Sequence, residues 1–320
     1  MENGLRSGKG TQKFMKNNEE YTLECTWENN KKNGEGVLLD PNGVMAMKLF
    51  FKDDVVDGEG TLFSNGQATF KGTWKEGKRT GHGVEFVNGH VVYDGNYEND
   101  QRNGFGIEYD DENQIAFEGE WVNNTRGLKS IIRTKKGERR LVEKDEAGND
   151  RFIGGCKENS LEREGFGTEF DSEGNPVFEG IYKDNALERK VKEFKGKEIV
   201  LYDEEGKKMY EGEYLNKKER HYPPHGQGKE FKNGIMVYKG QFRNGVREGE
   251  GCSYYANHCL MYDGHWQNGM ANGHGKFHND EGMVVVEGDF ENNMYQDDTI
   301  CVHVDSGKID QVKKMKGCFC

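Results

Sequence analysis

Histidine and cysteine side chains gather in the C-terminal third of the chain, where they could hold a metal ion. The set is Cys252, His258, Cys259, His265, His274 and His278. Structural zinc sites use paired ligands at short, regular spacings, whereas six residues separate these two cysteines and the histidines are scattered. The spacing therefore predicts no metal site.

Gly-x-Gly recurs along the chain and is the next motif that could do chemistry, because glycine-rich loops can cradle phosphates. Such a loop needs a strand-to-helix turn, but here each Gly-x-Gly lies within a hairpin pattern and leads into residues that alternate as in a strand. A nucleophile elbow and a helical His-Glu-x-x-His are also missing, and carboxylates are abundant everywhere in a chain of net charge -12. We predict no cofactor and no enzymatic activity.

The chain ends in two cysteines, Cys318 and Cys320, preceded by several lysines. This Cys-x-Cys ending resembles the doubly prenylated ending of vesicle-traffic GTPases, and lysines beside a lipidated cysteine would add a second membrane signal. Palmitoylation of either cysteine is an alternative chemistry for the same anchor. An unmodified, frayed tail is the other interpretation.

A basic segment, residues 126–140, carries seven lysines and arginines against one acidic residue, Glu138. The patch predicted from it consists of Arg133, Lys135, Lys136, Arg139 and Arg140. It favours an anion contact, with lipid head groups or with an acidic partner. The alternative is a solvated strand face that lysines protect from aggregation.

The elements that carry these residues follow from an internal repeat. The motif aromatic-x-Gly-x-aromatic recurs about every 23 residues, as in Phe70–Trp74, Tyr93–Tyr97, Tyr238–Phe242 and Tyr262–Trp266. Alternate residues of a strand share a face, so both aromatic residues and the glycine point to one side and the polar residues to the other. Each unit therefore predicts a strand with one apolar face.

Turn residues separate these strands. Pairs such as Asn29-Asn30, Asp53-Asp54, Asn99-Asp100 and Asn123-Asn124 follow the second aromatic residue and tolerate positive φ angles. Gly-x-Gly then opens the next strand, where positions without side chains would let neighbouring aromatic rings lie flat against the backbone. The repeat therefore predicts a β-hairpin.

The composition fits an ordered but thin fold. The chain has only 33% hydrophobic residues, yet it contains 45 glycines, 18 Phe, 14 Tyr and 4 Trp, which a disordered chain would lack. The acidic balance argues against nucleic acid, and seven scattered cysteines suit a reducing compartment. With neither a secretory signal nor an apolar span visible, we expect a cytoplasmic protein, with peripheral membrane association as an alternative.

The repeat units resemble those of the MORN (membrane occupation and recognition nexus) family, notably the stretches 210–214, 238–251 and 262–277. The resemblance implies an all-β fold: an elongated single-layer antiparallel sheet of about 11 stacked hairpins, twisted and curved. We expect an N-terminal lead-in (1–20), a repeat array (21–298) and a last strand with a basic, cysteine-containing tail (299–320). The array is expected to be irregular at 126–150 and 186–205, with a loop insertion at 217–225.

Two functions remain open at this stage. The first is a non-catalytic scaffold that binds a partner protein along an aromatic groove, because aromatic side chains bind at low entropic cost. The residues predicted to line it are Trp74, Tyr97, Trp121, Tyr214, Phe242 and Trp266, although the same rings supply the apolar packing of the sheet. The alternative is a membrane-apposed adaptor that uses the basic patch or a lipidated tail. A homodimer through an end hairpin is a further expectation.

Overall fold

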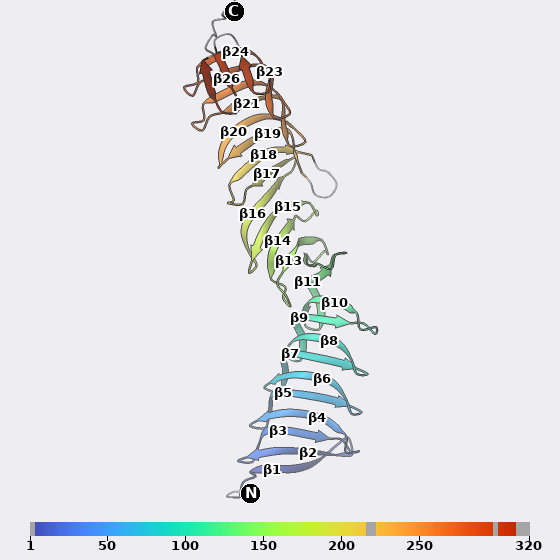
Figure 1. Ribbon diagram of the computed structural model, residues 1–320. Coiled ribbons are helices and arrows are strands. Elements are labelled where there is room, and N and C mark those ends of the chain that lie inside the picture. The colour runs from blue at the N-terminus through green and yellow to red at the C-terminus, as the bar shows by residue number, and fades with distance from the viewer. Residues whose placement is uncertain (1–3, 216–221, 297–299, 312–320) are drawn as a thin grey trace, which may run out of the picture. The chain divides into compact units, whose positions relative to one another are not determined.

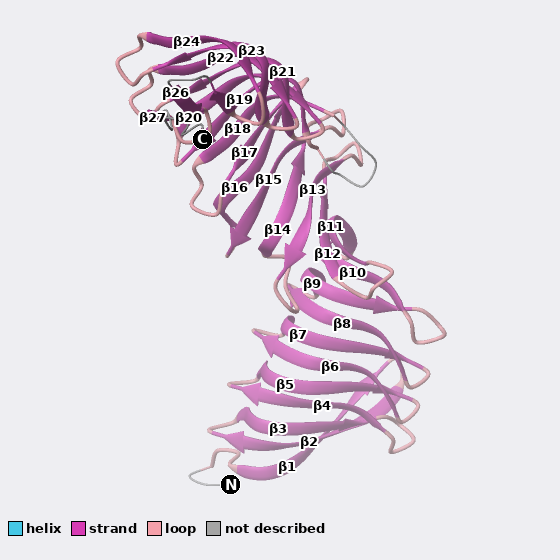
Figure 2. Ribbon diagram, turned by 45° about the horizontal axis from the view of Figure 1, so that its top comes forward, coloured by secondary structure: helices cyan, strands magenta, loops and turns pink. Residues whose placement is uncertain are grey.

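The computed structural model describes residues 4–215, 222–296 and 300–311. These residues form strands joined by turns, and no helix occurs among them (Figures 1 and 2). Strands β1 to β24 belong to one antiparallel sheet, and three further strands form a small second sheet. The predicted all-β, hairpin-repeat fold with an open sheet is therefore confirmed.

The first compact unit spans Met1–Glu164. Its strands are β1 (Gly8–Lys16), β2 (Glu19–Glu28), β3 (Lys31–Leu39), β4 (Met45–Lys52), β5 (Val55–Ser64), β6 (Gln67–Lys75), β7 (Lys78–Val87), β8 (His90–Glu98), β9 (Gln101–Tyr109), β10 (Ile115–Val122), β11 (Thr125–Arg133), β12 (Arg139–Lys144) and β13 (Asp150–Cys156). From β1 to β12, each strand pairs antiparallel with the next one in sequence.

The second unit spans Gly165–Cys320 and continues the same pattern of consecutive antiparallel pairs. Its strands are β14 (Arg163–Phe170), β15 (Pro176–Lys183), β16 (Ala186–Lys195), β17 (Glu198–Tyr202), β18 (Lys208–Tyr214), β19 (Pro224–Lys232), β20 (Ile235–Arg243), β21 (Val246–Tyr254), β22 (Leu260–Gln267), β23 (Met270–His278) and β24 (Val284–Phe290). The second sheet consists of β25 (Met294–Gln296), β26 (Ile300–His303) and β27 (Lys308–Gln311).

The predicted turn pairs adopt the left-handed conformation that a two-residue hairpin turn needs. Asn99 and Asp100 have φ angles of 50° and 70°, and Asn123 and Asn124 have 49° and 68°. Asn and Asp tolerate this region better than other residues that carry a Cβ. The turn chemistry in the sequence therefore fixes the positions at which the chain reverses.

Successive turns are fastened to one another by a reciprocal pair of hydrogen bonds. The backbone N–H of Asn124 donates to the carbonyl of Arg102 (3.0 Å), and the N–H of Arg102 donates back to Oδ1 of Asn124 (2.8 Å). Asp100 forms the same pair with Arg79. Where glycine follows in the turn, as at Gly269, only the backbone bond is present, to Arg247. An Asx residue in the second turn position thus fastens its repeat to the preceding one.

Glycines lie in register across the strands and receive the aromatic rings. Gly95 pairs with Gly106, and the ring of Tyr93 lies over both. A Cβ atom added at Gly106 would lie 2.6 Å from Cε2 and Cζ of that ring. The Tyr93 hydroxyl, at the far end of the ring, donates to the carbonyl of Asn96 (3.1 Å). The expected flat packing of rings on bare backbone is therefore present.

Some segments differ from their expected organisation. Strand β1 lies within residues 1–20, for which we expected only a lead-in, and it pairs with β2 along its whole length. Strand β19 begins at Pro224, inside the expected loop insertion. Both irregular segments keep antiparallel hairpins, and Gly196 lies in the turn between β16 and β17 with a φ angle of 63°. Aliphatic side chains such as Leu141 and Ile199 are fully buried there in place of rings.

Candidate interaction surface

The aromatic residues of unit 1 form a continuous column along one face of the sheet. Tyr93 contacts Tyr97 at a centroid distance of 5.6 Å and Trp121 at 5.2 Å, with interplanar angles of 89° and 83°. Phe70 makes the same edge-to-face contacts with Trp74 and Tyr97, both at 5.1 Å. Each ring thus contacts a ring of its own repeat and one of the next, in the geometry that aromatic pairs prefer.

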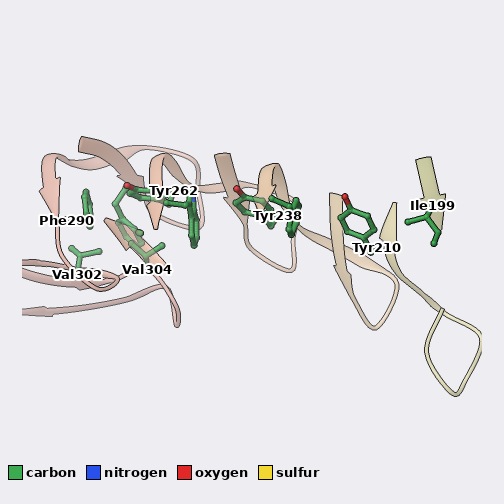
Figure 3. Close-up of a cluster of buried hydrophobic side chains, with 11 residues drawn as sticks. Ile199, Tyr210, Tyr238, Tyr262, Phe290, Val302 and Val304 are labelled. Atoms are coloured by element: carbon green, nitrogen blue, oxygen red, sulfur yellow. The ribbon is translucent and has the colours of Figure 1, made fainter. Parts of the chain in front are cut away.

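Unit 2 carries an equivalent column. Tyr238 contacts Phe242 at 5.2 Å and Trp266 at 5.1 Å, and Tyr262 contacts Trp266 at 5.4 Å and Phe290 at 5.0 Å. Figure 3 shows Tyr210, Tyr238, Tyr262 and Phe290 following one another along this face. We call the ring-bearing side of each unit its aromatic face.

Arginine side chains lie over the rings at regular intervals. The guanidinium of Arg102 lies 4.3 Å from the ring centroid of Tyr93 and 4.9 Å from that of Trp121. In unit 2, Arg247 lies 4.6 Å from Tyr238 and 5.0 Å from Trp266. Both arginines contact rings of two successive repeats, at distances typical of cation–π interactions.

Sequence reasoning missed these arginines, although a signal was present. The fifth residue after the second aromatic residue of a repeat is basic in five repeats, where it is Lys32, Arg79, Arg102, Arg126 and Arg247. We call this fifth residue the ladder position. Its periodicity could have been noticed, but the two rings that it joins lie in different repeats, and only the packing of hairpins brings them together.

Carboxylates hold the ladder arginines in place. Glu85 accepts hydrogen bonds from Arg102 and from the hydroxyl of Tyr97, the latter at 2.6 Å. Glu108 accepts from Arg126, with 3.0 Å between Nε and Oε2. Burial would raise the pKa of Glu85, but the bonds from Arg102 and Tyr97 outweigh burial and lower the pKa below its usual value. Arginine and glutamate side chains, joined by hydrogen bonds, thus cover the rings of the aromatic face.

The residues predicted to line a partner groove are mostly packed inside this arrangement. Their exposed fractions are Trp74 6%, Tyr97 3%, Trp121 3%, Phe242 6% and Trp266 2%. Tyr214 is half-buried and contacts Phe194 and Tyr222. These rings pack the sheet. Partner binding along the rings stays a prediction.

The predicted basic patch is largely neutralised by neighbouring carboxylates. Glu118 is only 4% exposed and binds both Arg133 (3.1 Å) and Arg139. Arg140 pairs with Glu138 at 3.1 Å. Lys135 and Lys136 are exposed at the turn between β11 and β12. The structure therefore brings Arg133 and Arg139 together around a buried acid and leaves these two lysines on the surface.

The opposite face of unit 1 carries an open groove of ≈ 700 Å³, whose lining includes Phe50, exposed over 48% of its surface. Lys48, Lys71, Glu35 and Glu59 are among its lining residues. Lys48 and Glu35 form an ion pair at 3.0 Å. This face therefore offers a matched contrast to the aromatic face in experiments.

The histidines and cysteines considered in the sequence do not form a cluster in the described residues. Within residues 4–215, 222–296 and 300–311, no group of three or more metal-ligating side chains is found. His265 pairs instead with Glu250 (3.1 Å), and His274 with Asp289 (3.2 Å). The described part of the chain has no helix that is long and apolar enough to cross a membrane. Cys318 and Cys320 lie outside the described residues.

The geometry defines a class of protein: an open antiparallel sheet of repeated hairpins, with a ring column on one face of each unit. The MORN repeat family model matches six segments, at residues 1–19, 26–45, 70–91, 93–113, 238–260 and 262–284. The chain is thus a MORN-repeat protein, and the resemblance seen in the sequence is confirmed. A comparison with curated proteins found no match.

The first matched segment covers the residues that sequence reasoning had assigned to a lead-in, in agreement with the pairing of β1 and β2. The remaining matches coincide with the regular hairpins and leave out both irregular segments. MORN repeats suggest an interaction scaffold or a membrane-associated scaffold, and such arrays are typically non-catalytic.

Proposed function

We propose that this protein is a non-catalytic scaffold that binds a partner protein along the aromatic face of its repeats. The observation that carries the proposal is an extended segment of the chain itself, β26, which is seated on this face in unit 2. Its Val302 is fully buried in the cluster that contains Tyr262 and Phe290. Because this face already binds one extended segment, it offers the apolar surface that an extended segment of a partner protein needs.

A partner that binds the aromatic face of unit 1 would contact the arginines at the ladder positions, which we call the arginine ladder. Arg79 and Arg102 are half-buried, and Arg126 is exposed over 51% of its side chain. Arginine is enriched in protein interfaces, where its planar group stacks on rings and donates several hydrogen bonds. The ladder would therefore set the orientation of a partner that lies across the rings.

A membrane-apposed adaptor is the weaker proposal. Three of the five basic residues predicted to attract anionic lipid are already paired with carboxylates, and only Lys135 and Lys136 extend the patch outward. Each lysine near an anionic surface contributes about 1 kcal/mol, so two provide little affinity. Lipidation of Cys318 or Cys320 would supply a separate anchor.

The test compares matched variants on the two faces of unit 1. Arg79→Met/Arg102→Met keeps the apolar stems over the rings but removes both charges, whereas Lys48→Met/Lys71→Met removes two charges from the opposite face. Proteins captured by the wild-type chain from its native cells are identified, and each is then tested as a purified partner. Binding should weaken only in the arginine variant. A loss that is equal in both variants, or absent from both, would contradict the proposal.

Co-sedimentation with anionic phosphatidylserine vesicles tests the membrane alternative. We expect no salt-sensitive binding of the unmodified full chain. Binding that disappears in Lys135→Gln/Lys136→Gln would favour the adaptor instead.

A further inference from the structure

The small second sheet closes the aromatic face at the C-terminal end of unit 2. Val302 and Val304 are essentially fully buried, at 0% and 1% exposure, and pack in one cluster with Tyr262, Trp266 and Phe290. Figure 3 shows Val302 next to Phe290 and Val304 next to Tyr262, on the ring-bearing side of the repeats. The two valines are two positions apart, as is typical of side chains that share one face of a strand.

One turn residue fastens this segment to the repeats. Asn293 makes the reciprocal turn bonds with Ala271: its N–H donates to the carbonyl (2.9 Å), and its Oδ1 accepts from the N–H (2.7 Å). The carbonyl of Asn293 then accepts the N–H of Val304 at 2.8 Å. The turn that joins repeats elsewhere in the chain thus also positions β26 and its extension.

Further contacts extend on both sides of β26. The ring of Tyr295, in β25, lies against Gly288 and contacts Phe290 at a centroid distance of 5.4 Å. Gly307 lies so close to Tyr255 that an added Cβ would be 2.5 Å from its Cε1. Residues 294–296 and 300–307, which include β25 and β26, therefore contact the repeats from β24 to the turn between β21 and β22.

Ala271 explains why the segment fits here. It occupies the ladder position of its repeat, where Arg247 and Arg102 lie over an edge-to-face pair of rings. The corresponding pair, Tyr262 and Phe290, is also edge-to-face at 5.0 Å, but the methyl group of Ala271 is too short to cover it, and Ala271 is itself fully buried. Valine side chains from β26 cover these rings instead.

We propose that the aromatic face around Tyr262 and Phe290 is an acceptor site for an extended segment with β-branched side chains at alternate positions, with β26 as its displaceable resident. Alanine at the ladder position lets β-branched side chains reach the rings directly, whereas arginine covers the rings, so that a partner of unit 1 would contact the guanidinium groups instead. This inference rests on the proposed function and deepens it, because it names the chemistry of the segment that the face accepts. An external partner with a Val-x-Val strand would compete with β26 for this site.

The test uses full-length chains and a synthetic peptide of residues 300–311 with Cys301→Ser, labelled with fluorescein. In the Val302→Asp/Val304→Asp chain, the resident segment should leave the face, because two buried carboxylates would have no partner. Hydrogen exchange should show that the amide of residue 304 has lost its protection while β20 to β22 keep theirs. Anisotropy should then show peptide binding to this opened chain.

Two comparisons decide the result. Binding should be at least about tenfold weaker to the wild-type chain, where β26 occupies the site, and to the opened chain that also carries Ala271→Arg. Val246→Arg, at an exposed position nearby, is the matched control and should leave binding unchanged. In an otherwise wild-type chain, Ala271→Arg alone should release residue 304, whereas Val246→Arg should not.

Several outcomes would overturn the inference. These are equal binding to the wild-type and opened chains, binding that tolerates Ala271→Arg, an opened chain that binds no peptide, and a residue 304 that stays protected in the opened chain. Because the peptide comes from this chain, such a failure does not touch partner binding in unit 1. The arginine variants of that unit test the proposed function separately.

Discussion

Gly106→Ala tests the packing of rings on glycine that builds the aromatic face. The new Cβ would lie 2.6 Å from two ring carbons of Tyr93, against about 3.5–4.0 Å for a comfortable carbon contact. The ring is fully buried and its hydroxyl is bonded to Asn96, so it cannot swing away. Overpacking of this kind costs about 1–3 kcal/mol, and we expect the upper part of that range.

Equilibrium unfolding in urea, followed by circular dichroism, measures the cost. Gly77→Ala is the matched control, because Gly77 has nothing within 4 Å of the position of a new Cβ but has a φ angle of 82°. It should lose only the roughly 1–2 kcal/mol of a left-handed alanine. Hydrogen exchange in β8 and β9 locates the destabilisation caused by Gly106→Ala.

A double-mutant cycle isolates the contact. The three atoms nearest to the new Cβ at Gly106 all belong to Tyr93, so Tyr93→Ala removes the clash. In that background Gly106→Ala should cost less than about 1 kcal/mol, which gives a coupling within the range of about 0.5–3 kcal/mol seen for residues in contact. Equal costs in both backgrounds would refute the reasoning.

Three further predictions concern the turns, the charged network and the ring column. Asn124→Gly keeps the turn conformation but removes the bond from the N–H of Arg102, and thermal unfolding should show a loss of about 0.5–1.5 kcal/mol; an unchanged midpoint would argue against the turn-to-turn fastening. Glu85 has a lowered pKa when folded, so the stability it contributes is present above its unfolded pKa of about 4.3 and is lost as the pH falls through the folded value; Glu85→Gln should flatten the pH dependence of urea midpoints below about pH 4.5. Trp121→Ala should cost about 3–5 kcal/mol, because the ring is buried between Tyr93 and Phe117, and a melting temperature equal to that of the wild-type chain would contradict this face assignment.

Local chemistry allowed the hairpins to be predicted from the sequence. Pairs such as Asn123-Asn124 specify left-handed turns, and the alternation around Gly95 specifies which side of the strand is apolar. Both signals act within one repeat, where backbone sterics and the two-residue period of a strand decide the outcome. The N-terminal repeat was missed because strand β1 carries a mostly polar sequence without the paired aromatic residues.

The candidate site depended on contacts between repeats. Arg102 stacks on rings that belong to two successive hairpins, and its carboxylate partner Glu85 lies 17 residues away. The basic patch looked free in the sequence because Glu118, which binds Arg133 and Arg139, is 15 and 21 residues distant from them. A count of charges in a short sequence segment does not show ion pairs between residues that are so far apart in the chain.

The sequence by itself determined the repeat, its turns and the two faces of each strand, since these follow from interactions among residues that are close in the chain. Only the tertiary structure decided which rings are covered by arginine and which by the chain's own strand. Around Ala271 the rings are covered by Val302 and Val304. These two valines join the cluster of Ala271 only after the last strands fold back onto the sheet. The physical reason is that burial and ion pairing depend on distance in space, which the stacking of hairpins sets and the spacing along the chain does not.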